Sequence, residues 1–309
     1  MKTLKSKLAG LAVASALTAA GSANAAFLLD DWQIDFGNAA LGIAGGPTVG
    51  GTSATSGIDF IGFNDSPLNV TYHDSDGIAG FSVGDTYTVL TKGFASGFGD
   101  TFSGDVSPLG LNFGGTFGGS DGFELTYDAS LTIRVTGGTI GAPVWEHVAN
   151  PADYLTFYID DLGDGGKATP GNGTGYTDGV KILTFTSVAG DGGAANVAGT
   201  LDGSDDATFV LTDVWVAGVF KTLAGDELTP GLTLGLVDSN FDLDSNNDDL
   251  LNETRGGFGC TAGNQSPTFF CGVEDGTFRL ATTVPAPATL GLLGAGLLGL
   301  ASMGRRRKV

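Results

Sequence analysis

The sequence predicts an all-β protein, with a β-sandwich or jelly-roll body, an N-terminal signal peptide and a single C-terminal transmembrane helix. Two observations predict the fold of the body. Segments with apolar residues at every second position recur along it, each bounded by Gly, Asp, Asn or Pro, and no stretch shows a sustained period of 3.6 residues. Short strands separated by turns are typical of antiparallel sandwiches. We therefore divide the 309 residues into segments 1–25, 26–283 and 284–309.

Residues 1–25 have the three parts of a secretory signal peptide. Three lysines lie within the first seven residues, residues 8–20 are apolar, and the small residues Ala23 and Ala25 occupy the two cleavage positions. The apolar run is short for a membrane-spanning helix, so we expect cleavage after Ala25 rather than permanent anchoring.

The body, residues 26–283, shows alternation most clearly in its second half. Phe123, Leu125 and Tyr127 share one face of a predicted strand over 123–138, and Arg134 lies on the other face. The same pattern predicts further strands at 153–161, 180–188, 207–216, 231–239 and 276–284. The earlier part is less regular, with short strands expected at 57–65, 68–74 and 84–94 and a loop at 37–57. Phe is interleaved with Gly over 94–123, a pattern that fits either a long surface loop or loosely packed strands.

The body is strongly acidic. All 34 Asp and Glu residues lie in it, whereas seven of the 14 Lys and Arg residues belong to the two terminal segments, which leaves the body with a formal charge of −27. Such a surface repels nucleic acid and anionic lipid. We expect no nucleic-acid partner. High net charge also keeps an exported protein soluble, and this need for solubility accounts for most of the negative charge of the body.

The only two cysteines, Cys260 and Cys271, predict one disulfide, because exported chains are oxidised. Closing so short a loop contributes about 3 kcal/mol in the chain-entropy model. The only histidines, His73 and His147, are distant in sequence, so two thiols alone do not predict a metal site.

The sequence predicts no cofactor with one exception: a calcium-binding loop is the strongest candidate for a ligand site. Residues 242–253 carry oxygen side chains at the spacing of an EF-hand loop, and the candidate ligands are Asp242, Asp244, Asn246, Asp248 (through its carbonyl) and Glu253. Position 6 of the loop is Asn rather than Gly, and no flanking helices are evident. Asp74 with Asp76, and Asp160 with Asp161 and Asp164, are weaker candidates. The alternative for all three groups is an acidic turn between strands, since Asp, Asn and Gly favour turns.

Catalysis has little support in the sequence. The chain has no Gly-x-Ser-x-Gly elbow, and His73 neighbours Asp74 on a strand, where adjacent side chains point to opposite faces. Among 34 acidic residues, some carboxylate pair will have glycosidase spacing by chance. We expect a protein that is not an enzyme.

The last segment, residues 284–309, explains where the protein goes. It begins with Val284, Pro285, Ala286 and Pro287, and ends with Arg305, Arg306, Arg307 and Lys308. Between them residues 288–304 carry no charge and would span roughly 26 Å as a helix, close to a hydrocarbon core of about 30 Å. The basic cluster is expected to stay in the cytoplasm, which leaves the body on the far side of the membrane.

This order of proline motif, apolar helix and basic cluster resembles the PEP-CTERM sorting signal of bacterial proteins. The usual motif is Val-Pro-Glu-Pro, and here Ala286 replaces the Glu. The resemblance implies an exosortase-type transpeptidase as partner and an association with exopolysaccharide. The body is weakly similar to flocculation-associated PEP-CTERM proteins, which share acidic aromatic and Gly/Phe-rich segments.

We therefore expect an exported, non-catalytic protein that is held in the inner membrane in transit. It is then anchored or processed at the cell surface or matrix, where it contributes to flocculation or biofilm structure. The alternative is a calcium-dependent carbohydrate-binding module, for which a concave sheet face with exposed aromatic residues such as Tyr158 or Trp215 would be the distinguishing feature. An ice-binding surface is a weaker alternative, because the threonine-rich strands are too short for a regular array.

Overall fold

The computed structural model describes most of the body of the chain. The residues it describes are 27–29, 32–42, 54–100, 104–105, 123–161, 168, 174–196, 202–242, 258, 266 and 268–283. The chain divides into two units, and Leu29–Ala281 is the unit that forms the body.

The described residues are almost entirely β-strand. In chain order the elements are β1 (Phe27–Leu29), β2 (Trp32–Asp35), the 3-10 helix η1 (Ala39–Leu41), β3 (Ala54–Ile58), β4 (Phe60–His73), β5 (Thr86–Asp100), β6 (Gly104–Asp105), β7 (Phe123–Thr139), β8 (Ala142–His147), β9 (Tyr154–Asp161), β10 (Val180–Val188), β11 (Gly192–Ala195), β12 (Asp202–Val214), β13 (Phe220–Thr222), β14 (Thr233–Asp242) and β15 (Phe269–Thr283). The predicted all-β class is confirmed.

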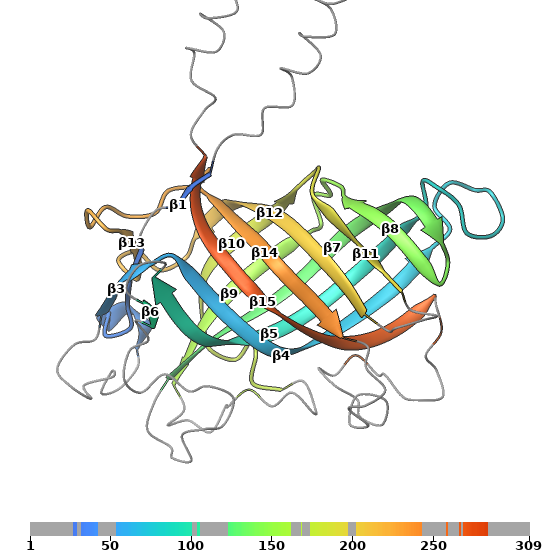
Figure 1. Cartoon of the computed structure of the whole chain (residues 1–309). Coiled ribbons are helices and arrows are strands. Elements are labelled where there is room, and N and C mark those ends of the chain that lie inside the picture. The colour runs from blue at the N-terminus through green and yellow to red at the C-terminus, as the bar shows by residue number, and fades with distance from the viewer. Residues whose placement is uncertain are drawn as a thin grey trace, which may run out of the picture. The chain divides into compact units, whose positions relative to one another are not determined.

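Eight strands of the large sheet close on themselves. The antiparallel neighbours run β4, β5, β7, β9, β10, β12, β14 and β15, and β15 pairs with β4 again. β8 and β11 form a second connection between β7 and β12. Figure 1 shows these strands winding around a common interior. The sheet therefore has one inner and one outer face.

The predicted sandwich or jelly roll is wrong in its arrangement, because one sheet curls instead of two sheets facing each other. The strands involved are long: β7 has 17 residues, β5 has 15 and β4 has 14. Strand twist accumulates over such lengths. Register shifts in β4 after Gly62 and in β15 between Glu274 and Gly276 add bulges, which increase local twist. Alternation along a strand looks the same in a sandwich and in a closed sheet.

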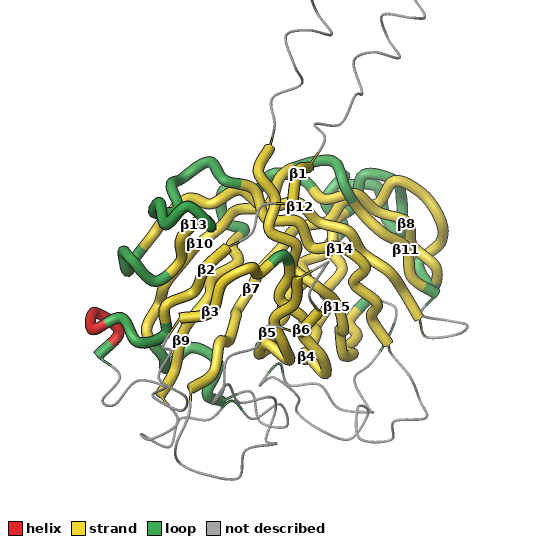
Figure 2. Tube along the Cα trace, turned by 60° about the vertical axis from the view of Figure 1, so that its left-hand side comes forward, coloured by secondary structure: helices red, strands yellow, loops and turns green. Residues whose placement is uncertain are grey.

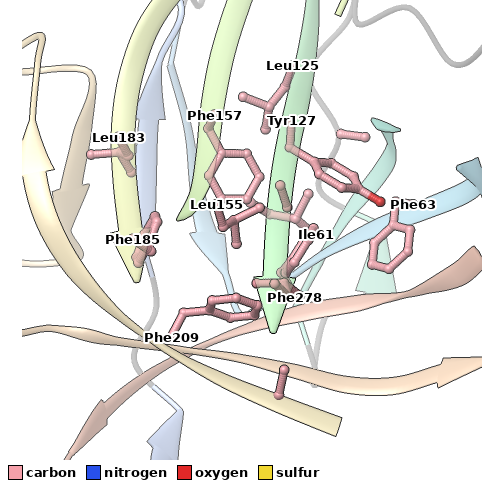
Figure 3. Close-up of a cluster of buried hydrophobic side chains, with 14 of the residues drawn as sticks. Ile61, Phe63, Leu125, Tyr127, Leu155, Phe157, Leu183, Phe185, Phe209 and Phe278 are labelled. Atoms are coloured by element: carbon pink, nitrogen blue, oxygen red, sulfur yellow. The ribbon is translucent and has the colours of Figure 1, made fainter. Parts of the chain in front are cut away.

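Aromatic rings fill the interior, as Figure 3 shows around Phe278. The centroid of the Phe278 ring lies 4.9 Å from that of Phe63, 5.2 Å from Tyr127 and 5.3 Å from Phe157. The rings of Tyr127 and Phe157 meet that of Phe278 edge-to-face, a favourable geometry for aromatic pairs. These rings come from four different strands, so they join the two sides of the closed sheet.

β13, β2 and β3 form a separate sheet of three strands, in that order (Figure 2). Buried side chains of this sheet belong to the same hydrophobic core as those of the large sheet. The rings of Trp32 and Phe220 meet edge-to-face at 6.0 Å within it. Phe36, just after β2, lies 4.2 Å from Phe123 and 5.9 Å from Phe98, measured between ring centroids. The small sheet thus packs beside the end of β5 and the beginning of β7.

Two glycines of β5 lie beneath aromatic rings of neighbouring strands. Gly99 is in register with Phe60, and Gly93 with Tyr127. A Cβ atom at either glycine would overlap the facing ring. Part of the alternation of Gly with Phe therefore reflects strand packing, in agreement with one of the two interpretations of residues 94–123. Residues 106–122 lie outside the described part of the chain.

The predicted strands in the second half of the body are all present, with boundaries shifted by up to seven residues, the largest shift being at the start of β15. Most of the segments 57–65 and 68–74, residues 60–65 and 68–73, belongs to one bulged strand, β4, rather than to two strands. The predicted loop at 37–57 contains η1 and most of β3. In both places Gly, Asn, Asp or Pro predicted that a strand would be interrupted. Hydrogen bonding to the neighbouring strands outweighs this local preference.

No helix in the described segments has the length and apolar character needed to span a membrane. The predicted signal peptide (1–25) and membrane helix (288–304) lie outside these segments and stay predictions.

Candidate functional sites

The interior of the closed sheet holds two carboxylates, Asp205 and Glu274. Both line two adjoining hollows of about 20 Å³ each, among otherwise mainly apolar side chains. Burial, reinforced by the charge of Glu274, raises the pKa of the Tyr127 hydroxyl well above its usual 10.0, so Tyr127 is neutral at physiological pH. A hollow of this size has room for about one water and not for a substrate.

Asp205 connects two side chains of β8. Its Oδ1 accepts a hydrogen bond from Trp145 Nε1 at 2.9 Å, and its Oδ2 lies 2.9 Å from His147 Nε2. The His147 side chain is fully buried, and its Nδ1 has no hydrogen-bond partner within the described residues. Burial lowers the pKa of His147, but the charge and hydrogen bond of Asp205, assisted by the charges of Asp191 and Asp153, outweigh it and raise the pKa above 6.5.

The contact between His147 and Asp205 is not predicted by the sequence. The two residues lie 58 positions apart and meet because β11 pairs with both β8 and β12. No local signal reveals this pairing. The other histidine, His73, is exposed, with its Nε2 at 2.9 Å from Thr88 Oγ1 on the next strand.

The acidic turn between β4 and β5 brings Asp74, Asp76 and Asp85 together. One carboxylate oxygen from each lies within 4.8 Å of the others, a spacing that a metal ion can bridge. Most of these oxygens already have protein partners, however. Asp85 accepts hydrogen bonds from the Tyr72 hydroxyl at 2.6 Å and from the Ser82 amide at 2.7 Å, and Asp76 accepts one from the Ser82 hydroxyl. These contacts explain the group as a turn, which was the alternative interpretation of this motif.

Acid should loosen this turn. The hydrogen bond from Tyr72, together with the amides of Ser82 and Ser75, outweighs burial and lowers the pKa of Asp85 from 3.8 to about 2. The folded pKa lies below the unfolded one, so this stabilisation is present above about pH 4 and is lost as pH falls toward 2. We expect Asp85→Asn to remove that part of the acid sensitivity and lower the melting temperature at pH 7. Thermal melts from pH 2 to 7 test this, with the exposed Asp74→Asn as control. An unchanged acid profile in Asp85→Asn would contradict it.

The predicted calcium loop lies almost entirely outside the described residues. Asp244, Asn246, Asp248 and Glu253 are not described, and Asp242 is described only as the backbone end of β14. The site stays a prediction. Of the weaker group, Asp160 lies in β9, in register with the equally buried Glu124 of β7. Glu124 accepts a hydrogen bond from the Ala168 amide at 2.6 Å. Asp164 is outside the described part.

Cys271 is buried on β15, and Asn69 Nδ2 lies 3.4 Å from its sulfur. No cysteine among the described residues is a free thiol. Cys260 is not described, so the predicted pairing of Cys260 with Cys271 stays a prediction.

A groove of about 730 Å³ lies on the outer face of β9, β10 and β12. Tyr154, Thr156 and Tyr158 of β9 line it, as do Lys181 and Thr184 of β10. Trp215, which directly follows β12, is 55% exposed and donates a hydrogen bond from Nε1 to Thr184 Oγ1 at 3.0 Å. The half-buried Tyr158 lines the groove, and the exposed Trp215 stands beside it, in contact with Lys181 and Thr184 of its lining. These are the two aromatic residues that the sequence suggested for a carbohydrate-binding face.

The fold and these sites define an all-β protein with a packed interior and a polar outer groove. Comparison with known proteins indicates where in the cell the protein is sent. Residues 283–308 match the model of the PEP-CTERM protein-sorting motif, which confirms the resemblance of the tail. The motif implies export and cell-surface targeting, with an exosortase as processing partner. No curated protein and no solved structure matches the chain.

Proposed function

We propose that this chain is a non-catalytic surface or matrix protein that an exosortase-type enzyme processes and that contributes to flocculation or biofilm structure. The observation that carries the proposal is the sorting motif at residues 283–308. An apolar helix over residues 288–304 anchors the protein in the inner membrane in transit. The disulfide between Cys260 and Cys271 suits this exported setting.

Two features of the body support a role without catalysis. The His147–Asp205 pair lies in an interior whose hollows have room for about one water each. The high negative charge suits a protein that stays dispersed outside the cell and does not bind nucleic acid.

Removal of residues 284–309 tests the proposal. Because the truncated chain lacks both the motif and the apolar helix, we expect it to be released into the periplasm or medium, whereas the full chain is found with the envelope or matrix. Fractionation, with intact mass of each form, measures this. Ala286→Glu restores the usual motif and should be processed at least as completely.

A full-length chain that remains in the cytoplasm with an intact Met1 would refute the proposal. So would identical fractionation of the full and truncated chains. Leu223→Ala, which changes an exposed side chain of the body, controls for general effects of substitution and should fractionate like the unmodified chain.

A further inference from the structure

We propose that the groove on the outer face of β9, β10 and β12 binds a neutral polysaccharide chain. This inference names the polymer partner of the surface protein proposed above and rests on that proposal only for the place where the polymer is met. The three strands are neighbours in the closed sheet (Figure 1), so the groove has a continuous floor of hydrogen-bonded backbone.

An aromatic row crosses these strands. Tyr158 of β9 is in register with Lys181 of β10, and the Lys181 ammonium lies 4.1 Å from the centroid of the Trp215 ring. The cation over its face and the hydrogen bond to Thr184 fix the orientation of the Trp215 ring while 55% of the residue stays exposed. A fixed, exposed indole offers a flat apolar surface with little entropy left to lose. The apolar C–H face of a sugar ring stacks on such a surface.

A polar row lies beside the aromatic one. Asp128 of β7, Thr156 of β9 and Thr184 of β10 are cross-strand neighbours in register. The Thr156 and Thr184 hydroxyls lie 3.1 Å apart, and the Tyr154 hydroxyl donates to Asp128 at 2.8 Å. Hydroxyls and carboxylates supply the mixture of donors and acceptors that sugar hydroxyl groups require. Aromatic rings beside a few placed polar groups are the usual composition of a ligand site.

Charge decides which polymer fits. The body's formal charge of −27 repels an anionic polymer. A cationic polymer is attracted by that charge and by the aspartates of the groove, Asp128, Asp153 and Asp213. At the stacking surface, however, it would meet the ammonium of Lys181, which lies 4.1 Å from the centroid of the Trp215 ring. A neutral chain avoids both penalties. Its length is not limited at this site, because the groove is open to solvent and not enclosed like the interior hollows.

Affinity electrophoresis of the purified full-length chain, in mild detergent, tests the inference. Gels containing dextran, laminarin, xyloglucan or galactomannan are compared with gels containing anionic alginate. We expect at least one neutral polymer to retard the protein and alginate not to. Trp215→Ala should weaken that binding about tenfold, the scale seen when an aromatic anchor is truncated, and Tyr158→Ala should weaken it in the same direction. Trp215→Phe should retain most of it.

Leu223→Ala is the matched control, since Leu223 is also a half-exposed apolar residue (51%) but does not line the groove. Thermal melts verify that each variant is folded. The inference is overturned if no neutral polymer binds, if alginate binds best, or if folded Trp215→Ala binds like the unmodified chain. A dimer in sedimentation that Trp215→Ala dissociates would assign the groove to a second copy and also overturn it. Failure of export would leave these results unchanged, so the two proposals fail separately.

Discussion

Replacing Phe278 by Ala should lower the free energy of unfolding by about 3–5 kcal/mol, the largest loss that we expect from a single substitution in this body. Phe278 is 3% exposed, and its ring contacts Phe63, Tyr127 and Phe157 on three other strands. Truncation removes the transfer free energy of the ring and leaves a cavity that rigid strands cannot close. In a domain of this size, the melting temperature should fall by roughly 6–20 °C.

Thermal unfolding followed by circular dichroism measures this change. Phe278→Leu keeps most of the volume and should lose less than half as much stability. Leu223→Ala, on the surface, should stay within about 0.5 kcal/mol of the unmodified chain. If Phe278→Ala melted at the same temperature as Leu223→Ala, the close packing of aromatic rings in the interior would be wrong.

Replacing Asp205 by Ala should destabilise the fold by about 3 kcal/mol, since it leaves the buried His147 without its charged partner and Trp145 without its acceptor. The expected fall in melting temperature is roughly 6–12 °C. Glu146 is the matched control. It pairs with Arg134 on the surface, where such pairs contribute at most about 1 kcal/mol, so Glu146→Ala should have a small effect.

The same pair predicts a pH dependence. The folded pKa of His147 is raised above the unfolded value near 6.5, so the folded state binds more protons between these two pKa values. The stabilisation is therefore full below about pH 6.5 and is lost as pH rises through the folded pKa. Urea unfolding from pH 5 to 9 should show this decline in the unmodified chain and not in His147→Gln. A decline of equal size in both would exclude His147 as its cause.

Some properties follow from the sequence by itself. The alternation over residues 123–138 and 180–188 predicts β7 and β10 because the pleat of a strand places every second side chain on one face. The tail motif is equally local, since a linear order of Pro285, Pro287, an apolar run and a basic cluster contains all of its information. Neither depends on contacts between distant residues.

Only the tertiary structure decides how the strands close and which side chains meet. Closure depends on accumulated twist and bulges, and on β15 pairing with β4 about 200 residues away, none of which alternation encodes. Asp205 joins His147, and Trp215 joins Lys181 beside Tyr158, because register between strands brings them together. A sequence specifies the face on which each side chain lies, whereas the register, a balance of many small pairing energies, selects its neighbours.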